Sequence, residues 1–395
     1  MVRRVGSVVL GVVGVVLVFA AFRPARLANG LALTPPMGWN SWNHFGCNVS
    51  SALIRGVADS MAANGMRDAG YQYVVIDDCW QVARDAKGMI VADSVRFPGG
   101  IKPLADYVHS KGLKFGIYTD AGRKTCEGRP GSYGYEEIDA RTYARWGVDY
   151  VKIDWCNAEG LDAPTQYAKL RDALATSGRP IVFSICEWGQ NHPYEWAPAI
   201  GNLWRTTGDI SDTWDSMIAN FDLNAQFAND AKPGAWNDPD MLEVGNGGLS
   251  RDESRAHMSL WAIAAAPLLA GNDVRTMNDS SRESRIAREV LLNREVIAVD
   301  QDSLGVQGRM VSNSRSELQV WAKPLKDGSH AVVLLNRANV PARINANWAR
   351  IGVKGTNTRV RDLWAHKDTT VTGGGYGVNV PPHGAVMLRA WPIRN

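Results

Sequence analysis

Short apolar runs that end abruptly in acidic or aromatic residues recur over the first two thirds of the chain. Four of them are the most distinct, and each reads as a buried β-strand: residues 73–80, 150–156, 204–210 and 235–242. An apolar run that stops at a charged group places that group at the carboxyl end of a strand, where parallel α/β folds build their active sites. The pattern therefore predicts a pocket rich in acid groups with aromatic walls.

Between residue 33 and about residue 302, short β-branched strands alternate with longer amphipathic stretches, which argues for a parallel sheet with helical crossovers. The alternation contains about eight candidate strands, the number of strands in a barrel: residues 37–39, 74–76, 115–118, 151–153, 181–184, 203–205, 241–244 and 267–269. A helix is predicted over residues 101–111, ended by Gly112 as a C-terminal cap. The competing architecture is a doubly wound open sheet, and the absence of a glycine-rich phosphate loop after the first strand weighs against it.

The pattern changes after residue 305, where no further strand–helix alternation is visible. Short alternating segments follow, such as residues 318–321 and 331–335, and Asp327-Gly328 offers a hairpin turn. The glycine run at residues 373–375 reads as a loop, and residues 385–388 as a last strand. We expect an α/β barrel over residues 29–303 and a small antiparallel all-β domain over residues 304–395.

The amino-terminal segment predicts export. Arg3 and Arg4 precede an uncharged apolar run over residues 6–22, which is the pattern of a signal peptide. The run is almost long enough to stay as a membrane anchor, so residues 1–28 are a signal peptide or an N-terminal anchor, and a membrane is a partner only if the segment is retained. We expect a secreted, extracellular protein.

Charge and cysteine content narrow the class further. The formal net charge of +3 becomes −1 without the four arginines of the leader. The charge therefore gives no indication of nucleic-acid binding, which needs a clustered basic face. Five cysteines in an exported chain are most simply two disulfides and one free thiol, with the pairing left open. No C-x-x-C or H-x-x-x-H spacing exists, which leaves a structural zinc site with little support.

Asp154 and Asp209 are the best pair of acid groups at the strand ends. Two carboxyl groups about 5 to 5.5 Å apart are what retaining glycoside hydrolysis needs, one to attack the anomeric carbon and one to protonate the leaving oxygen. Lys152 points to the same strand face as Asp154 and is expected to hold it ionised. Ile210 and Trp214 near Asp209 can raise its pKa toward that of a general acid.

Other readings of the acid groups stay open. Asp212 is a rival for the acid role. A single aspartate at a strand end more often caps a helix or forms a buried ion pair. These structural roles account poorly for five aspartates at successive strand ends: Asp77, Asp78, Asp154, Asp209 and Asp240. Oxygen-rich clusters also suit calcium, magnesium or manganese, although Lys152 and Arg205 in the same set oppose a cation.

Tryptophans accompany these polar motifs. The chain has 15, many for its length, and seven lie beside the motifs: Trp39, Trp42, Trp80, Trp155, Trp188, Trp204 and Trp236. Aromatic faces stack on the apolar C–H face of a sugar, and Trp42 is the first choice for that platform, although core packing is the commoner role of any one tryptophan. The set favours a sugar pocket.

The same motifs make the chain resemble glycoside hydrolase family 27, and its α-galactosidases (melibiases) in particular. They are MGWNSW at 37–42, IDDCW at 76–80, GIYTDAG at 116–122, KIDWC at 152–156, CEWG at 186–189, RTTGDI at 205–210, WNDPDML at 236–242 and NREVIAVDQDSLG at 293–305. The resemblance covers the chain from about residue 33 to the carboxyl terminus, in the family's order. The resemblance implies a (β/α)8 TIM barrel followed by a C-terminal antiparallel β-sandwich.

The resemblance also implies an activity and its residues. The activity is exo-acting, retaining hydrolysis of terminal α-D-galactosyl residues from oligosaccharides or galactomannan by double displacement, with no cofactor and no metal. Asp154 is then the nucleophile and Asp209 the acid/base, which decides against Asp212. The implied substrate-binding residues are Trp42, Asp77, Asp78, Tyr118, Lys152, Cys186, Glu187, Trp188, Arg205 and Asp240, and the implied disulfides are Cys47–Cys79 and Cys126–Cys156.

Cys186 lacks the partner that some relatives have before the sixth strand and is expected as a free thiol at the pocket wall. Glu187 and Trp188 leave less room for an N-acetyl group than the small residues of N-acetylgalactosamine-releasing relatives. The Asp77-Asp78 pair suits hydroxyls at positions 4 and 6 and so favours galactose over β-L-arabinopyranose. A β-L-arabinopyranosidase, a non-catalytic galactose-binding protein and a metal-dependent barrel hydrolase stand as the alternatives.

Overall fold

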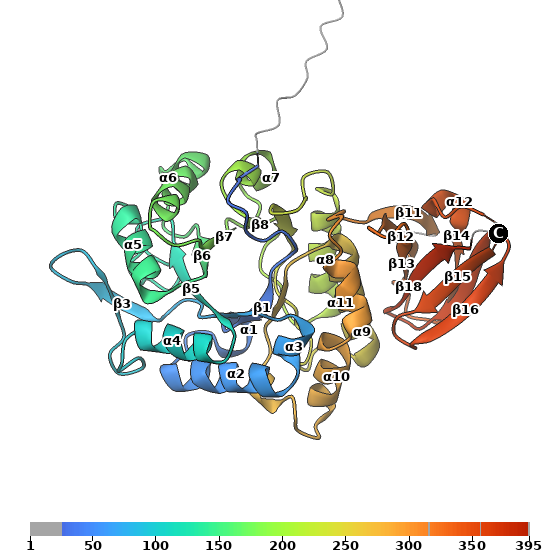
Figure 1. The fold of residues 1–395 in the computed structure, drawn as a ribbon, viewed down its shortest axis with the longest axis horizontal. Helices are drawn as coiled ribbons and strands as arrows, with labels where there is room; N and C mark the ends of the chain where they lie inside the picture. Colours follow the sequence, from blue (N-terminus) through green and yellow to red (C-terminus); the bar gives the residue numbers. More distant parts are fainter. Residues whose placement is uncertain (1–25, 315–316, 356, 394–395) are drawn as a thin grey trace, which may run out of the picture.

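The computed structural model describes residues 26–314, 317–355 and 357–393, which form two units (Figure 1). The larger unit ends with helix α11 (Arg294–Asp300), and the smaller one begins with strand β11 (Arg309–Ser314). The predicted leader falls almost wholly outside the described residues. Within the part of the chain that is described, no helix combines the length and the apolar character needed to span a bilayer.

Eight parallel strands form the centre of the larger unit, in the order β10-β1-β2-β5-β6-β7-β8-β9. They are β1 (Met37–Asn40), β2 (Tyr73–Val75), β5 (Lys114–Asp120), β6 (Tyr150–Asp154), β7 (Val182–Ile185), β8 (Leu203–Arg205), β9 (Trp236–Asp238) and β10 (Leu268–Ala270). A parallel bridge between Leu242 and Ala270 joins the two ends of this order. The predicted (β/α)8 barrel is confirmed, and the open-sheet alternative is not.

The seventh strand lies at the start of the predicted run 235–242 and not at the candidate residues 241–244. It ends at Asp238 because Pro239 has no N–H to donate and Asp240 takes a φ of 87°. The apolar run still completes the barrel, since Leu242 donates its N–H to Leu269 O at 2.8 Å and accepts from Gly271 N at 3.0 Å. The run therefore bridges the barrel without being a strand of its own.

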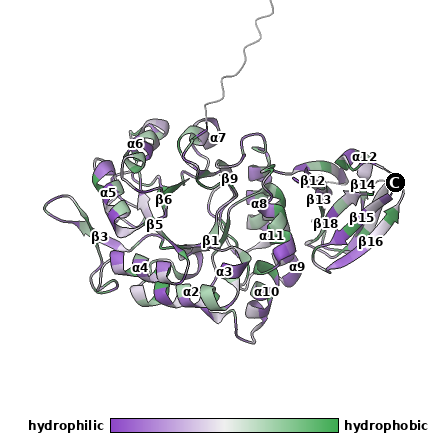
Figure 2. Ribbon diagram, in the orientation of Figure 1, coloured by the Kyte–Doolittle hydropathy of each residue, from purple (hydrophilic) through white to green (hydrophobic). Residues whose placement is uncertain are grey.

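Helices surround the barrel, and long helices such as α2 and α9 carry both hydrophobic and hydrophilic residues, as the mixed colouring of Figure 2 shows. They are α1 (Trp42–Phe45), α2 (Ser51–Ala63), α3 (Met66–Ala69), α4 (Lys102–Ser110), α5 (Glu136–Trp146), α6 (Ala163–Ala175), α7 (Pro193–Trp196), α8 (Trp214–Ala225), α9 (Arg251–Ala264), α10 (Arg282–Leu291) and α11. Helix α4 matches the predicted helix, and Gly112 after it has a φ of 71°. Short 3-10 turns lie at Ala197–Ala199 and Val274–Thr276, and a small hairpin, β3 (Gln81–Arg84) with β4 (Ile90–Ala92), projects after β2.

The smaller unit is an antiparallel β-sandwich, as the resemblance implied. Its six-stranded sheet has the order β11-β12-β13-β18-β15-β16, and β14 pairs with β17 in a second sheet. The elements after β11 are β12 (Leu318–Pro324), β13 (His330–Asn336), β14 (Ala342–Asn347), α12 (Trp348–Ile351), β15 (Asn357–Asp362), β16 (Lys367–Thr372), β17 (Gly375–Val380) and β18 (Gly384–Pro392). Asp327-Gly328 lies in the turn between β12 and β13, as predicted, and the sandwich has a core of its own around residues such as Leu334, Ile344 and Leu388.

The two units share a packed interface on helix α9. Trp321, Val333 and Met387 of the six-stranded sheet belong to the same hydrophobic core as the barrel helices. Lys323 of β12 is buried and donates to the carbonyl of Ala262 on α9 at 2.8 Å. The sandwich therefore packs on the outer side of the helix layer and leaves the strand ends of the barrel free.

Candidate active site

A cavity of about 610 Å³ is formed by residues at and just beyond the carboxyl ends of the barrel strands. It brings together ten of the twelve catalytic and binding residues that the resemblance implied, from segments far apart in the sequence: Trp42, Asp77, Asp78, Tyr118, Lys152, Asp154, Trp188, Arg205, Asp209 and Asp240. Their convergence follows from the parallel sheet, because every strand ends on the same side of the barrel.

Asp77 and Lys152 form an ion pair in the wall of the cavity. Lys152 Nζ lies 3.0 Å from Asp77 Oδ2, which also accepts from Asn40 Nδ2 at 2.7 Å. Asp78 is held by backbone donors, Cys79 N at 2.6 Å from Oδ1 and Glu127 N at 3.1 Å from Oδ2. Both carboxylates are thus fixed before any ligand arrives.

Asp154 is a buried carboxylate at the end of β6 with one unused oxygen. Burial raises its pKa, and Lys152 lowers it by charge attraction but does not cancel the rise. Its Oδ1 atom is buried and accepts no hydrogen bond from the described residues. Asp154 lines the cavity, and a desolvated carboxylate with an unpartnered oxygen is suited to nucleophilic attack.

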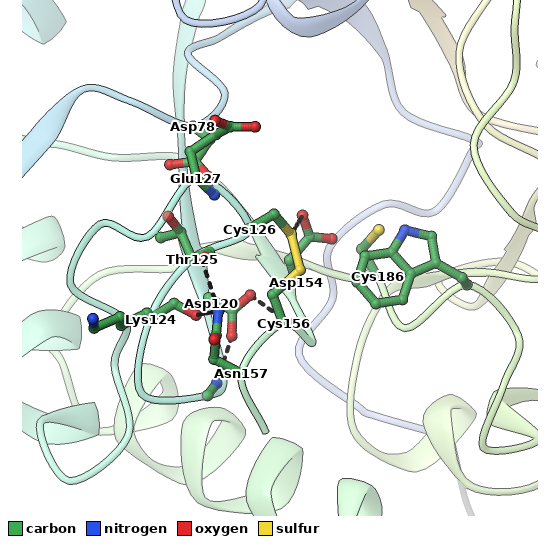
Figure 3. The surroundings of a disulfide bond; sticks show 12 residues. Asp78, Asp120, Lys124, Thr125, Cys126, Glu127, Asp154, Cys156, Asn157 and Cys186 are labelled. Carbon is green, nitrogen blue, oxygen red and sulfur yellow. Dashed lines mark hydrogen bonds between the residues drawn. A yellow bond between two sulfur atoms is a disulfide. The ribbon is translucent and has the colours of Figure 1, made fainter. Parts of the chain in front are cut away.

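The Cys126–Cys156 disulfide lies directly beside Asp154 (Figure 3). Cys126 Sγ is 3.6 Å from Asp154 Oδ2 and 3.6 Å from the Tyr118 hydroxyl. A disulfide sulfur carries no hydrogen, so its contact with Asp154 is packing and not a donated bond. The second disulfide, Cys47–Cys79, joins the loop after β1 to the loop after β2, and both pairings are those that the resemblance implied.

Asp209 has a different environment. Its side chain is 64% exposed, and its Oδ1 accepts from Arg205 Nη2 at 3.0 Å and from Trp188 Nε1 at 3.1 Å. Arg205, only 4% exposed, also lies 3.0 Å from Asp240 Oδ2. Burial raises the pKa of Asp209, but Arg205 and then Lys152 outweigh it, so the pKa lies below its usual value.

The electrostatic expectations for the two aspartates hold only in part. Lys152 lowers the pKa of Asp154 as expected, but burial raises it more. The pKa of Asp209 is lowered, whereas apolar neighbours were expected to raise it. Burial outweighs Lys152 at Asp154, because Lys152 forms its close ion pair with Asp77. Burial is the largest single effect at Asp209, but the charges of Arg205 and Lys152 and the hydrogen bonds from Arg205 and Trp188 together outweigh it.

Strained backbone accompanies the site. Cys79, Trp188 and Asp240 all have positive φ angles, of 75°, 56° and 87°, although none is a glycine. Each such residue costs about 1 to 3 kcal/mol and persists only where surrounding contacts hold it. Trp188 and Asp240 line the cavity, and Cys79 is the residue that pairs with Cys47.

Cys186 and Glu187 do not line this cavity, contrary to expectation. Cys186 is a buried free thiol and lines a separate small cavity with Lys152 and Arg205. Glu187 turns to its own loop, where its Oε2 accepts from the backbone and side chain of Asn191, and burial raises its pKa to about 7. The loop after β7 therefore presents Trp188 to the cavity and uses Glu187 internally.

Sequence reasoning did not select several residues that line the cavity: Asn43, His44, Glu243 and Asn246. Glu243 follows the WNDPDML motif directly, and that proximity was a usable signal. Asp212, the rival acid, also lines the cavity, but its two oxygens accept from Gly248 N and Leu249 N. Asp212 therefore fixes a loop, whereas the Oδ2 atom of Asp209 accepts no hydrogen bond from the described residues.

Potential metal ligands are grouped in two places within the described part of the chain. One group is Cys47, Cys79 and Glu127, and the other is Asp120, Cys126 and Cys156. The cysteines of both groups are oxidised to disulfides and have no thiolate to offer. Neither group has the donor set of a metal site.

Known proteins resemble both units. Residues 34–302 match the family described as alpha galactosidase A, and residues 315–390 match the alpha galactosidase C-terminal beta sandwich domain. An α-galactosidase of Cyamopsis tetragonoloba is 51% identical over 92% of this chain and 88% of its own, and α-galactosidase A of Cellvibrio japonicus is 46% identical over 97% and 98%. The crystal structure of α-galactosidase I from Mortierella vinacea superposes with a TM-score of 0.88 at 37% identity, covering 92% of this chain and 98% of that one.

The matches cover both units in one order, and the relatives are similar over nearly their whole length. The chain therefore belongs to the α-galactosidase family of glycoside hydrolases, family 27.

Proposed function

We propose that this family member is a retaining, exo-acting α-galactosidase that removes terminal α-D-galactosyl residues from oligosaccharides or galactomannan, with Asp154 as nucleophile and Asp209 as acid/base. The observation that carries the proposal is the contrast between two carboxylates of one cavity. Asp154 is buried with a free oxygen, and Asp209 is 64% exposed beside Arg205. Retaining glycosidases need two carboxylates in such different roles.

In the first step Asp154 Oδ1 attacks the anomeric carbon and the glycosidic C–O bond breaks. The proton of the Asp209 carboxyl passes to the leaving oxygen, and a galactosyl ester of Asp154 forms. A bound sugar removes water from Asp209, and this desolvation raises the pKa that Arg205 holds low in the free protein. Asp209 is thereby protonated in the complex with the sugar, where it donates the proton to the leaving oxygen.

In the second step the Asp209 carboxylate takes a proton from water. The water oxygen attacks the anomeric carbon, the ester bond breaks, and the Asp154 carboxylate and protonated Asp209 are restored. Two inversions at one carbon give net retention. Neither step transfers electrons or requires a metal, so the proposal includes no cofactor.

Recognition of galactose is assigned to the polar groups around the nucleophile. Asp77, Asp78, Lys152, Arg205 and Asp240 are held by hydrogen bonds or ion pairs with one another and with the backbone. Buried polar groups that lose a matching hydroxyl reject the substrate strongly, so we expect selection for the axial hydroxyl of galactose. Trp42, Tyr118 and Trp188 supply aromatic faces for the ring.

The proposed location is outside the cytoplasm. Two disulfides among the described residues fit an oxidising compartment. The amino-terminal apolar run adds the proposal of secretion by a signal peptide, with anchoring if the segment is retained.

The test is hydrolysis of 4-nitrophenyl α-D-galactopyranoside, with the first anomer of the released sugar followed by NMR. Wild type should release α-galactose first, and Asp154→Ala should lose turnover. Asp106→Ala is the matched control, because this exposed carboxylate of α4 pairs with Lys102 and does not line the cavity.

Each alternative has its own outcome. Release of β-galactose first contradicts the two-carboxylate roles. Faster hydrolysis of the aryl β-L-arabinopyranoside identifies the enzyme as a β-L-arabinopyranosidase, and galactose binding without turnover identifies a binding protein.

A further inference from the structure

Glu243 is a buried carboxylate that lines the cavity and takes no part in the proposed chemistry. It follows β9, is 3% exposed, and accepts hydrogen bonds on both oxygens. Asn43 Nδ2 donates to Oε1, and Asn246 Nδ2 donates to Oε2 at 2.6 Å. Glu243 therefore bridges the loop after β9 and helix α1, on which Asn43 lies.

Helix α1 depends on such tethers. It has four residues, Trp42–Phe45, and its N-cap Ser41 makes no side-chain capping bond. A single helical turn is unstable by itself, because nucleation fixes several residues for one hydrogen bond. Trp42 is the first residue of this turn, so its orientation is set by what other elements hold α1.

The tethers act on two sides of α1. The Cys47–Cys79 disulfide fixes the chain just after α1, and Phe45 packs edge-on against Trp39 with ring centres 6.1 Å apart. On the cavity side the tethers are polar, from Asn43 to Glu243 and from His44 Nδ1 to Asn246 Oδ1 at 3.0 Å. The four residues of these polar tethers and Trp42 all line the same cavity.

Glu243 is itself anchored to the barrel wall. Its backbone N–H donates to His257 Nε2 at 3.1 Å, and His257 is fully buried on α9. Burial lowers the pKa of His257 to about 3, so the imidazole is neutral and can accept this bond. Through Glu243, the single turn of α1 is thus connected to the long, packed helix α9.

We propose that Glu243 is a positioning residue that holds Trp42 in the orientation that stacks on the bound sugar. The inference rests on the proposed function, because Trp42 is the assigned platform. A carboxylate suits this position, since its two oxygens receive two amide donors, whereas a glutamine offers one acceptor and one donor.

The test compares KM and kcat for 4-nitrophenyl α-D-galactopyranoside in Glu243→Ala, Asn43→Ala and the double variant. Trp42 touches the sugar and not the reacting atoms, so KM should rise about tenfold while kcat changes by less than about threefold. The double variant should have the same KM as Glu243→Ala, because both changes remove one bridge. Glu243→Gln should fall between wild type and Glu243→Ala.

Glu295→Gln is the matched control, because Glu295 also bridges two partners, Arg361 at 2.8 Å and His366 at 2.7 Å, but at the junction of the two units. Its KM should match wild type. Asn43→Ala is the milder change and keeps the test valid if Glu243→Ala fails to fold, which circular dichroism detects.

A second substrate, an α-galactosyl disaccharide, separates positioning from direct contact. Equal KM effects on both substrates support the positioning of Trp42. An effect confined to the disaccharide, or multiplied effects in the double variant, would overturn it. No wild-type turnover at all refutes the proposed function, whereas an active wild type with unchanged KM in both single variants refutes only the role of Glu243.

Discussion

The two disulfides allow one prediction to be worked out in detail, because they close loops of almost equal length. The separations are 32 residues for Cys47–Cys79 and 30 for Cys126–Cys156. The entropy of closing loops of this size in the unfolded chain corresponds to about 3.7 kcal/mol for each. Replacing either pair by alanines should therefore lower the free energy of unfolding by about the same amount.

The effects on activity should differ, because the two disulfides touch different parts of the site. Cys126 packs 3.6 Å from Asp154 Oδ2, and its neighbour Glu127 donates to Asp78. Loss of Cys126–Cys156 should mainly lower kcat by loosening the nucleophile. Loss of Cys47–Cys79 releases the chain after α1, so it should mainly raise KM through Trp42.

The assay is urea denaturation followed by circular dichroism, together with KM and kcat for the aryl galactoside under conditions where each variant is folded. Cys79 is fully buried, so its alanine adds a small packing loss, and we allow a difference of about 1 kcal/mol between the variants. Stability losses that differ by more than about 2 kcal/mol would refute the loop-entropy reasoning. The same change in kcat and KM for both variants would refute the assignment of separate roles.

Three further outcomes are expected. Asp209→Ala should lose about 10² to 10⁴ in kcat with a poor leaving group and much less with an activated aryl one, and equal losses on both contradict the acid role. His257 has a pKa of about 3 in the folded protein against 6.5 unfolded, so the stability that its neutral form contributes is present above pH 6.5 and is lost as the pH falls toward 3. His257→Gln should therefore reduce the slope of the free energy of unfolding against pH, measured by urea denaturation. An unchanged slope would contradict a neutral, buried imidazole. Dialysis against EDTA should leave kcat/KM unchanged, and a loss restored by a divalent cation would revive the metal-dependent alternative.

Much of the fold was readable from the sequence because its signals are local. Seven of the eight candidate strands lie where the structure has a barrel strand, since a strand buried on both faces is a short continuous apolar segment. The exception is instructive: residues 241–244 are as apolar as a strand, but Pro239 and the positive φ of Asp240 end the ladder before them. Whether such a run pairs depends on the backbone around it and not on its composition.

The direction of the pKa shifts of Asp154 and Asp209 could not be predicted from the sequence. Lys152 is the sequence neighbour of Asp154, yet its ion pair is with Asp77, 75 residues earlier. Arg205 reaches Asp209 and Asp240 together, and this outweighs the apolar neighbours that we had considered. A pKa responds to distance and burial in space, which sequence proximity does not measure.

Most strand ends, and with them the acid and aromatic residues at one edge of the barrel, could be predicted from the residues alone, since the apolar run that marks a strand is a local signal. How the loops beyond those ends meet depends on the packing of the whole fold. Glu243 reaches Asn43 across 200 residues, and Glu187 turns away to Asn191. Closure of the barrel creates the contact of Glu243 with Asn43, and packing of the loop creates that of Glu187 with Asn191. Both contacts depend on where whole elements lie and not on any periodicity along the chain.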